Sequence, residues 1–200
     1  MTKNFQKICL ILALGLLVTA CAAPARVGNM VPEKEQNVSV QGSSPFAKQV
    51  RIEDVSGGKE TNPMWTSQVG NKEFEDALKF ALLNHNLLAK EEGRYSLSVK
   101  MIQLDQPIFG ADFTVTAEVQ YTLTDTIQNS IVFDEKITRP FTATMSDAFY
   151  GVERLRLANE GAIKTNLTEF IRLLIQHSQK NNLISDKDAL LMSNITVEVR

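Results

Sequence analysis

The chain has 200 residues, a length that suits one folded domain with short extensions rather than two domains. Apolar residues make up 44% of it and charged residues 22%, so it can bury a core and is not a disordered polyelectrolyte. Its formal net charge of -2 gives no electrostatic attraction to phosphate backbones, and we expect no nucleic-acid partner.

Residues 1–20 have the pattern of a bacterial export signal. Lys3 and Lys7 precede an apolar stretch, residues 8–18. This stretch is shorter than the roughly 20 residues needed to span a bilayer. This stretch ends in a sequence that resembles the lipobox of bacterial lipoproteins, Val18-Thr19-Ala20-Cys21. We therefore expect cleavage before Cys21 and lipidation of its thiol, with acyl chains such as palmitate. An ordinary cleavage site beside an incidental cysteine is the alternative.

Processing at this site decides both the cysteine chemistry and the location of the protein. Cys9 leaves with the signal peptide and Cys21 becomes a thioether, so the processed chain has no thiol for catalysis, a disulfide or a metal. Two or more acyl chains on one residue hold a protein stably on a membrane. Ala22 follows Cys21, where aspartate would retain a lipoprotein in the inner membrane, and this predicts the periplasmic face of the outer membrane.

Residues 21–48, which begin with the lipidated cysteine, are predicted to form a flexible tether. They are rich in proline, glycine and serine and show no sustained apolar period. The globular domain is predicted over residues 49–177.

The first half of this domain is expected to contain a strand, a helix and a second strand. Residues 49–55 alternate apolar with polar side chains, as in a half-buried strand. Residues 71–88 have the spacing of an amphipathic helix with acidic residues in its first turn. Residues 95–101 again alternate apolar with polar side chains, which predicts the second strand.

The second half adds two strands and a long helix. Residues 113–124 alternate without interruption and leave one wholly polar face, which is typical of an antiparallel sheet covered on one side. A strand over residues 130–142 is expected to pair with it and to direct four apolar residues inward, Ile131, Phe133, Ile137 and Phe141. Residues 147–177 have the pattern of a long amphipathic helix.

The resulting order β-α-β-β-β-α predicts an α+β two-layer sandwich, in which two helices cover one face of a four-stranded antiparallel sheet. Residues 178–200 form a tail that contains one more alternating run, residues 195–199. This run is expected either to add an edge strand or to fray.

The sequence contains none of the motifs of serine hydrolases, phosphate-binding loops or zinc proteases, and we expect no catalytic residue, cofactor or metal. His85 and His177 have no partner at metal-ligand spacing and are interpreted as structural residues at helix ends. Asp105 and Asp112 flank a turn and are interpreted as acidic turn residues rather than a glycosidase pair.

One further group of charges has helical spacing. Glu153, Arg156 and Glu160 are predicted to form a solvated ladder of ion pairs on the last helix. A cleft that gathered Asp105, Asp112, Arg139 and Glu153 would instead favour an enzyme.

Two loops carry candidate contact residues. Met64 and Trp65 lie in the loop over residues 57–66, and both residue types are enriched at interfaces. Ile108 and Phe109 occupy a turn where polar residues are usual. Each pair either contacts a partner protein or lipid, or packs back onto the domain.

Three segments, residues 57–65, 104–110 and 146–160, resemble a family of small uncharacterised proteobacterial outer-membrane lipoproteins. Some members carry the label UDP-N-acetylglucosamine acyltransferase, but that enzyme is a cytoplasmic protein built from hexapeptide repeats, which this chain lacks. The order of elements is also similar to that of YajG-type lipoproteins and, more distantly, of the lipopolysaccharide-assembly lipoprotein. Fold-level likeness does not transfer function.

Three functions remain open. The favoured one is a non-enzymatic outer-membrane lipoprotein that binds or scaffolds another envelope protein. The alternatives are a lipid- or glycolipid-binding module, with an apolar opening near Phe109 and Trp65, and an enzyme such as the labelled acyltransferase. The enzyme is disfavoured because no catalytic motif is present.

Overall fold

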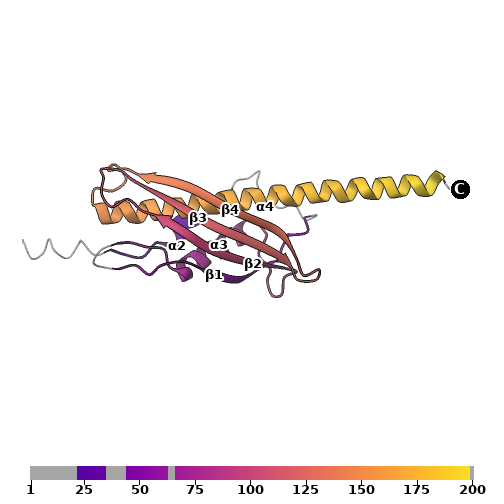
Figure 1. Cartoon of the computed structure of the whole chain (residues 1–200), viewed down its shortest axis with the longest axis horizontal. Coiled ribbons are helices and arrows are strands. Elements are labelled where there is room, and N and C mark those ends of the chain that lie inside the picture. The colour runs from indigo at the N-terminus through magenta and orange to yellow at the C-terminus, as the bar shows by residue number, and fades with distance from the viewer. Residues whose placement is uncertain (1–21, 35–43, 63–65, 199–200) are drawn as a thin grey trace, which may run out of the picture.

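A computed structural model describes residues 22–34, 44–62 and 66–198, with side chains described as far as residue 180. Four strands and two helices form an α+β sandwich, preceded by the one-turn helix α2 (Val27–Met30) (Figure 1). In chain order they are β1 (Val50–Ser56), α3 (Asn71–Asn84), β2 (Tyr95–Asp105), β3 (Phe113–Asp125), β4 (Ser130–Ala143) and α4 (Gly151–Glu198). The fold class expected from the sequence is confirmed.

The sheet has the order β1-β2-β3-β4 and is mostly antiparallel. The pairing of β1 with β2 is parallel, whereas the sequence prediction had all four strands antiparallel. The reason is the intervening helix, because α3 returns the chain to the end of the sheet at which β1 began.

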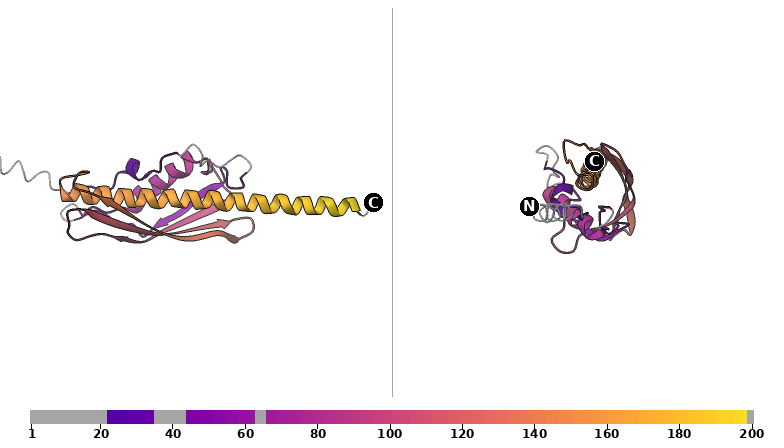
Figure 2. Two further views of the ribbon diagram at one scale, coloured as in Figure 1. Left: turned by 90° about the horizontal axis from the view of Figure 1, so that it is seen from above. Right: turned by 90° about the vertical axis from the view of Figure 1, so that its left-hand side faces the viewer.

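The core lies between the sheet and the helices. Figure 2 shows the sheet curving around α4, with α3 and the N-terminal segment on the same side of the sheet. The rings of Tyr121 on β3 and Phe170 on α4 are nearly parallel, with centroids 4.1 Å apart. Alternate residues of β3 are buried from Phe113 to Asp125, as the alternation in the sequence predicts.

α4 differs from its predicted bounds at both ends. Residues 144–147 form a turn in which the backbone N–H of Thr144 donates to Asp147 Oδ2 (2.7 Å), so α4 begins only at Gly151. At the other end, residues 178–198 continue the helix and form no edge strand. With 48 residues at about 1.5 Å each, α4 is roughly 70 Å long and extends beyond the sheet (Figure 1).

Candidate binding site

Residues 22–34, here called the strap, pack against the domain although the sequence predicted a flexible tether. Met30 is fully buried, and Ala25 is 5% exposed. Ala22, the first of the described residues, is 6% exposed. Residues 44–48 also belong to the domain, because Phe46 is buried with its ring edge against Tyr95. The predicted spacer is therefore at least partly folded.

The strap is held by one carboxylate of α4. Glu160 Oε1 accepts a hydrogen bond from the backbone N–H of Arg26 (2.7 Å), and Oε2 accepts one from Asn29 Nδ2 (2.6 Å). Such charge-assisted bonds are stronger than neutral ones. Because Glu160 is only 1% exposed, these bonds are shielded from competing water.

The charged ladder of α4 is consequently not solvated as expected. Arg156 is paired with Glu153, and its Nε lies 3.5 Å from Glu160 Oε1, yet the Arg156 side chain is only 7% exposed. The strap covers this part of the helix. A sequence pattern typical of a solvated helix face thus forms a cluster in which Arg156 and Glu160 are buried and Glu153 stays partly exposed.

Two further contacts fix the ends of the strap. Ser67 Oγ donates to the carbonyl of Ala23 (2.8 Å), and Lys164 forms an ion pair with Glu33 (2.8 Å). The hydrogen bond from Lys164 lowers the pKa of Glu33. The strap is therefore held near its start by Ser67 and near its end by Lys164 of α4.

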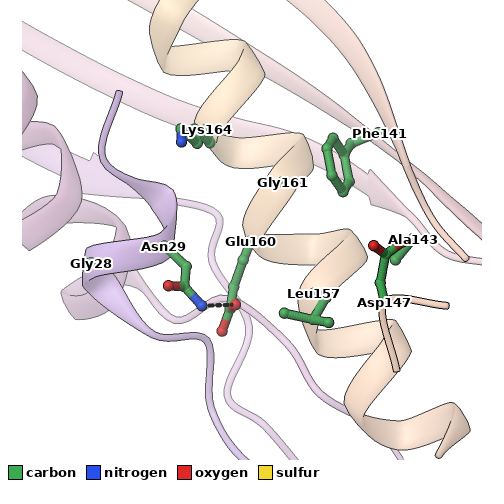
Figure 3. Close-up of a pocket in the computed structure, with 9 residues that line it drawn as sticks. All are labelled: Gly28, Asn29, Phe141, Ala143, Asp147, Leu157, Glu160, Gly161 and Lys164. Carbon is green, nitrogen blue, oxygen red and sulfur yellow. Dashed lines mark hydrogen bonds between the residues drawn. The ribbon is translucent and has the colours of Figure 1, made fainter. Parts of the chain in front are cut away.

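A cavity of about 420 Å³ lies where the strap meets β4 and α4 (Figure 3). The strap, the last part of β4, the turn after it and α4 provide its nine lining residues: Gly28, Asn29, Phe141, Ala143, Asp147, Leu157, Glu160, Gly161 and Lys164. The apolar side chains among them come from β4 and α4, and the charged ones, Asp147, Glu160 and Lys164, come from the turn after β4 and from α4.

The shape of the cavity depends on a close contact between Phe141 and Gly161. A Cβ atom added at Gly161 would lie 2.2 Å from the Phe141 ring, so only glycine allows the ring to rest on the helix. Phe141 is 38% exposed and Leu157 is half-buried, so both present apolar surface to a ligand. Because Glu160 and Asp147 are already hydrogen-bonded within the protein, the cavity is suited to binding an apolar group beside polar atoms rather than to proton transfer.

The residues that would have indicated an enzyme are not gathered in one cleft. Arg139 is paired with Glu169 (2.5 Å), and Glu153 is paired with Arg156. Asp112 Oδ1 accepts a bond from the backbone N–H of Met145 (3.3 Å), and Asp105 is exposed at the end of β2. Within the described residues, no group of acidic, histidine or cysteine side chains is arranged to hold a metal ion.

Both histidines have structural environments. His85 follows the end of α3 and is 3% exposed, with Nδ1 2.8 Å from the carbonyl oxygen of Ala81, so its predicted position at the helix end is confirmed. His177 lies within α4 rather than at its end, and its ring contacts Phe46 and Phe133.

The predicted contact residues divide into two groups. Ile108 and Phe109 are 95% and 86% exposed at the tip of the β2–β3 loop. Met64 and Trp65 lie outside the described residues, as do Val18, Thr19, Ala20 and the lipidation site Cys21. The strap residues Arg26 and Asn29 were missed by the sequence analysis, because no local period marks them.

No family model and no curated protein matches the chain. Among solved structures, protein XCC0632 from Xanthomonas campestris, described as DUF330, has a TM-score of 0.53 at 13% identity over 73% of this chain and 95% of its own. A minor lipoprotein from Acinetobacter baumannii has a TM-score of 0.43 at 10% identity, over 65% of this chain and 94% of its own. The XCC0632 likeness shows a shared fold. No helix among the described residues is both long and apolar enough to cross a membrane.

Proposed function

We propose that this protein is a lipoprotein anchored through Cys21 at the periplasmic face of the outer membrane, where its domain acts as a non-enzymatic binding module for another envelope protein. The observation that carries the proposal is the folded strap. Its first described residue, Ala22, follows Cys21 in the sequence, and the strap forms one wall of the cavity with β4 and α4. A lipid on Cys21 would then be joined directly to a segment that is folded onto the domain.

The chemistry of the cavity favours binding over catalysis. Among the residues that line the cavity, Lys164 is paired with Glu33 and Glu160 holds the strap. These two charged side chains therefore already have structural partners. A catalytic acid or base needs access to its substrate and a pKa matched to the proton transfer. An apolar side chain of a partner would instead bury against Phe141 and Leu157.

The test is photo-crosslinking in living cells, with a benzophenone amino acid in place of Gly28 or Leu157. Gly28 suits this purpose because a Cβ there meets nothing within 4 Å. The matched control is Lys79, which is exposed on α3 away from the cavity. We expect one envelope protein to be captured at both cavity positions and not at Lys79.

Two other outcomes would contradict the proposal. Capture of phospholipid or lipopolysaccharide at the cavity positions would favour a lipid-binding function. A mature parent protein that carries no acyl mass on Cys21, or a Cys21→Ala variant that fractionates with membranes as the parent does, would refute the lipid anchor.

A further inference from the structure

Two loops at one end of the domain expose large apolar side chains. The β2–β3 loop carries Ile108 and Phe109, and the β4–α4 loop carries Phe149 and Tyr150, which are 76% and 63% exposed. Figure 1 shows both loops at the same end of the sheet, opposite the β3–β4 turn and the C-terminal part of α4. None of these four side chains belongs to the core, so core packing does not account for large apolar residues at these positions.

A buried arginine joins the two loops. Arg154 is 5% exposed and donates from Nη1 to the carbonyls of Ala148 (2.8 Å) and Phe149 (3.1 Å), while Nη2 donates to that of Gly110 (3.4 Å). Its guanidinium also lies over the Phe113 ring, 4.7 Å from the centroid. The backbone of the two loops is therefore held together, and their apolar tips form one surface, here called the apolar tip.

The start of the strap lies beside the base of this tip. Gln106, at the start of the β2–β3 loop, donates to the carbonyl of Ser67 (3.0 Å) and to Asn159 Oδ1 (2.7 Å). Ser67 Oγ in turn donates to the carbonyl of Ala23. Ala23 is only two residues from Cys21, and two residues span at most about 7 Å. A lipid on Cys21 cannot lie far from the base of the loop.

We propose that the apolar tip, Ile108, Phe109, Phe149 and Tyr150, inserts into the interfacial region of the membrane that holds the lipid anchor. The inference rests on the proposed lipidation of Cys21 and adds a defined orientation: the sheet and α4 extend away from the bilayer. Side chains with an apolar body and a polar end, such as Tyr150, are favoured in this region, and the apolar rings beside it gain from leaving water. Asp112 and Asp147 lie in the same two loops, so insertion depends on apolar burial and not on anionic lipids.

The experiment uses the processed full chain reconstituted in phosphatidylcholine vesicles. Because Cys9 is removed and Cys21 is blocked, a cysteine introduced by Phe109→Cys or Tyr150→Cys is the single free thiol and can carry an environment-sensitive fluorophore. Ile127→Cys is the matched control, since Ile127 is 75% exposed at the opposite end, in the β3–β4 turn. We expect quenching by brominated acyl chains to be roughly threefold stronger at residues 109 and 150 than at residue 127.

The remaining outcomes are equally decisive. Equal, weak quenching at all three positions, in protein that sediments with the vesicles, would overturn the inserted tip and leave the anchor intact. A blue shift at residues 109 and 150 in lipid-free solution would also overturn it and assign the tip to self-association. Protein with no lipid mass at Cys21 and no sedimentation would instead refute the proposed function. Replacing Phe109 and Phe149 by aspartate should reduce the quenching of a fluorophore at residue 150 to the level found at residue 127.

Discussion

Glu160 and Arg26 are 134 positions apart in the chain and are joined by a hydrogen bond of 2.7 Å between a buried carboxylate and a backbone N–H. The same carboxylate binds the side chain of Asn29. One residue of α4 thereby holds the segment that would connect the domain to its lipid. If Cys21 is lipidated as proposed, this contact would determine whether the lipid is joined to a flexible tether or to a folded segment.

Glu160→Ala is expected to release the strap while the rest of the domain stays folded. The change leaves the Arg26 N–H and the Asn29 side chain without their acceptor, at a cost of about 1–3 kcal/mol. Amide hydrogen exchange should show at least a tenfold loss of protection at Arg26, because a tenfold change corresponds to about 1.4 kcal/mol. Glu153→Ala is the control: it lies on the same helix but does not touch the strap. Equal exchange in both variants would contradict this assignment of Glu160.

The strands and helices were predictable because their signals are local. The alternation over residues 113–124 predicts β3 to within one residue of Phe113–Asp125. The burial of β4 was only partly predictable, since Phe133 and Ile137 are buried but Ile131 is 62% exposed. A register shift opposite Leu123 and Thr124 turns Ile131 to the other face, and such a bulge leaves no periodic signal.

The binding site was much less predictable. The strap has no helical or strand period, and it is held by residues distant in the chain: Ser67, 44 positions from Ala23, and Glu160, more than 130 positions from Arg26 and Asn29. Met30 and Phe46, the two largest apolar residues of this segment, were the available signal that residues 21–48 do not form a simple spacer. The burial of Glu160 likewise follows from the strap that covers it, whereas the spacing of its helix gives only a charged face.

Gly161→Ala should have opposite effects in two backgrounds. With Phe141 present, the new methyl group displaces the ring, and we expect destabilisation of about 1–2 kcal/mol. In a Phe141→Ala background the conflict is removed, and the higher helix propensity of alanine should stabilise the protein by up to about 1 kcal/mol. Urea unfolding of the four proteins measures this coupling. The same effect in both backgrounds would mean that the ring does not rest on Gly161.

Tyr121→Phe is expected to destabilise the domain by about 1–3 kcal/mol. The Tyr121 hydroxyl donates to Asn166 Oδ1 (2.8 Å), and Asn166 Nδ2 donates to the carbonyls of Ala117 (3.1 Å) and Ile137 (2.8 Å), so this buried amide joins α4 to β3 and β4. Removing the hydroxyl leaves the buried Asn166 oxygen without its donor. Tyr150→Phe, at an exposed position, is the control and should change stability by less than about 0.5 kcal/mol.

The pH dependence of the same variant has a definite sign. Burial raises the pKa of Tyr121 well above the ordinary value of 10.0, so the folded state disfavours the phenolate. The resulting stability is present below pH 10 and is lost as the pH rises above it, because the unfolded chain then ionises first. The difference in unfolding free energy between the parent protein and Tyr121→Phe should therefore shrink from pH 9 to about pH 11. A constant difference would contradict the burial of an un-ionised Tyr121.

Acid should weaken the end of the sheet opposite the apolar tip. Asp125 Oδ2 accepts bonds from Arg94 Nε (3.0 Å) and NH2 (2.6 Å), and Oδ1 accepts bonds from the backbone N–H groups of Ile127 (2.9 Å) and Gln128 (3.2 Å). The bond from Arg94, followed by those from the backbone, holds the pKa of Asp125 below its ordinary value of 3.8. This carboxylate ties the β3–β4 turn to the start of β2.

A lowered carboxyl pKa gives stability that is present above the ordinary pKa and is lost as the pH falls through the folded value. Asp125→Asn should consequently lower the midpoint of thermal unfolding at pH 7, and the gap to the parent protein should close as the pH falls below about 4. Asp134→Asn is the control, since Asp134 is exposed on the outer face of the sheet and accepts bonds only from Gln120 and Thr122 among the described contacts. If the gap persisted unchanged at pH 3, the loss would come from the altered shape of the turn and not from the ionised pair.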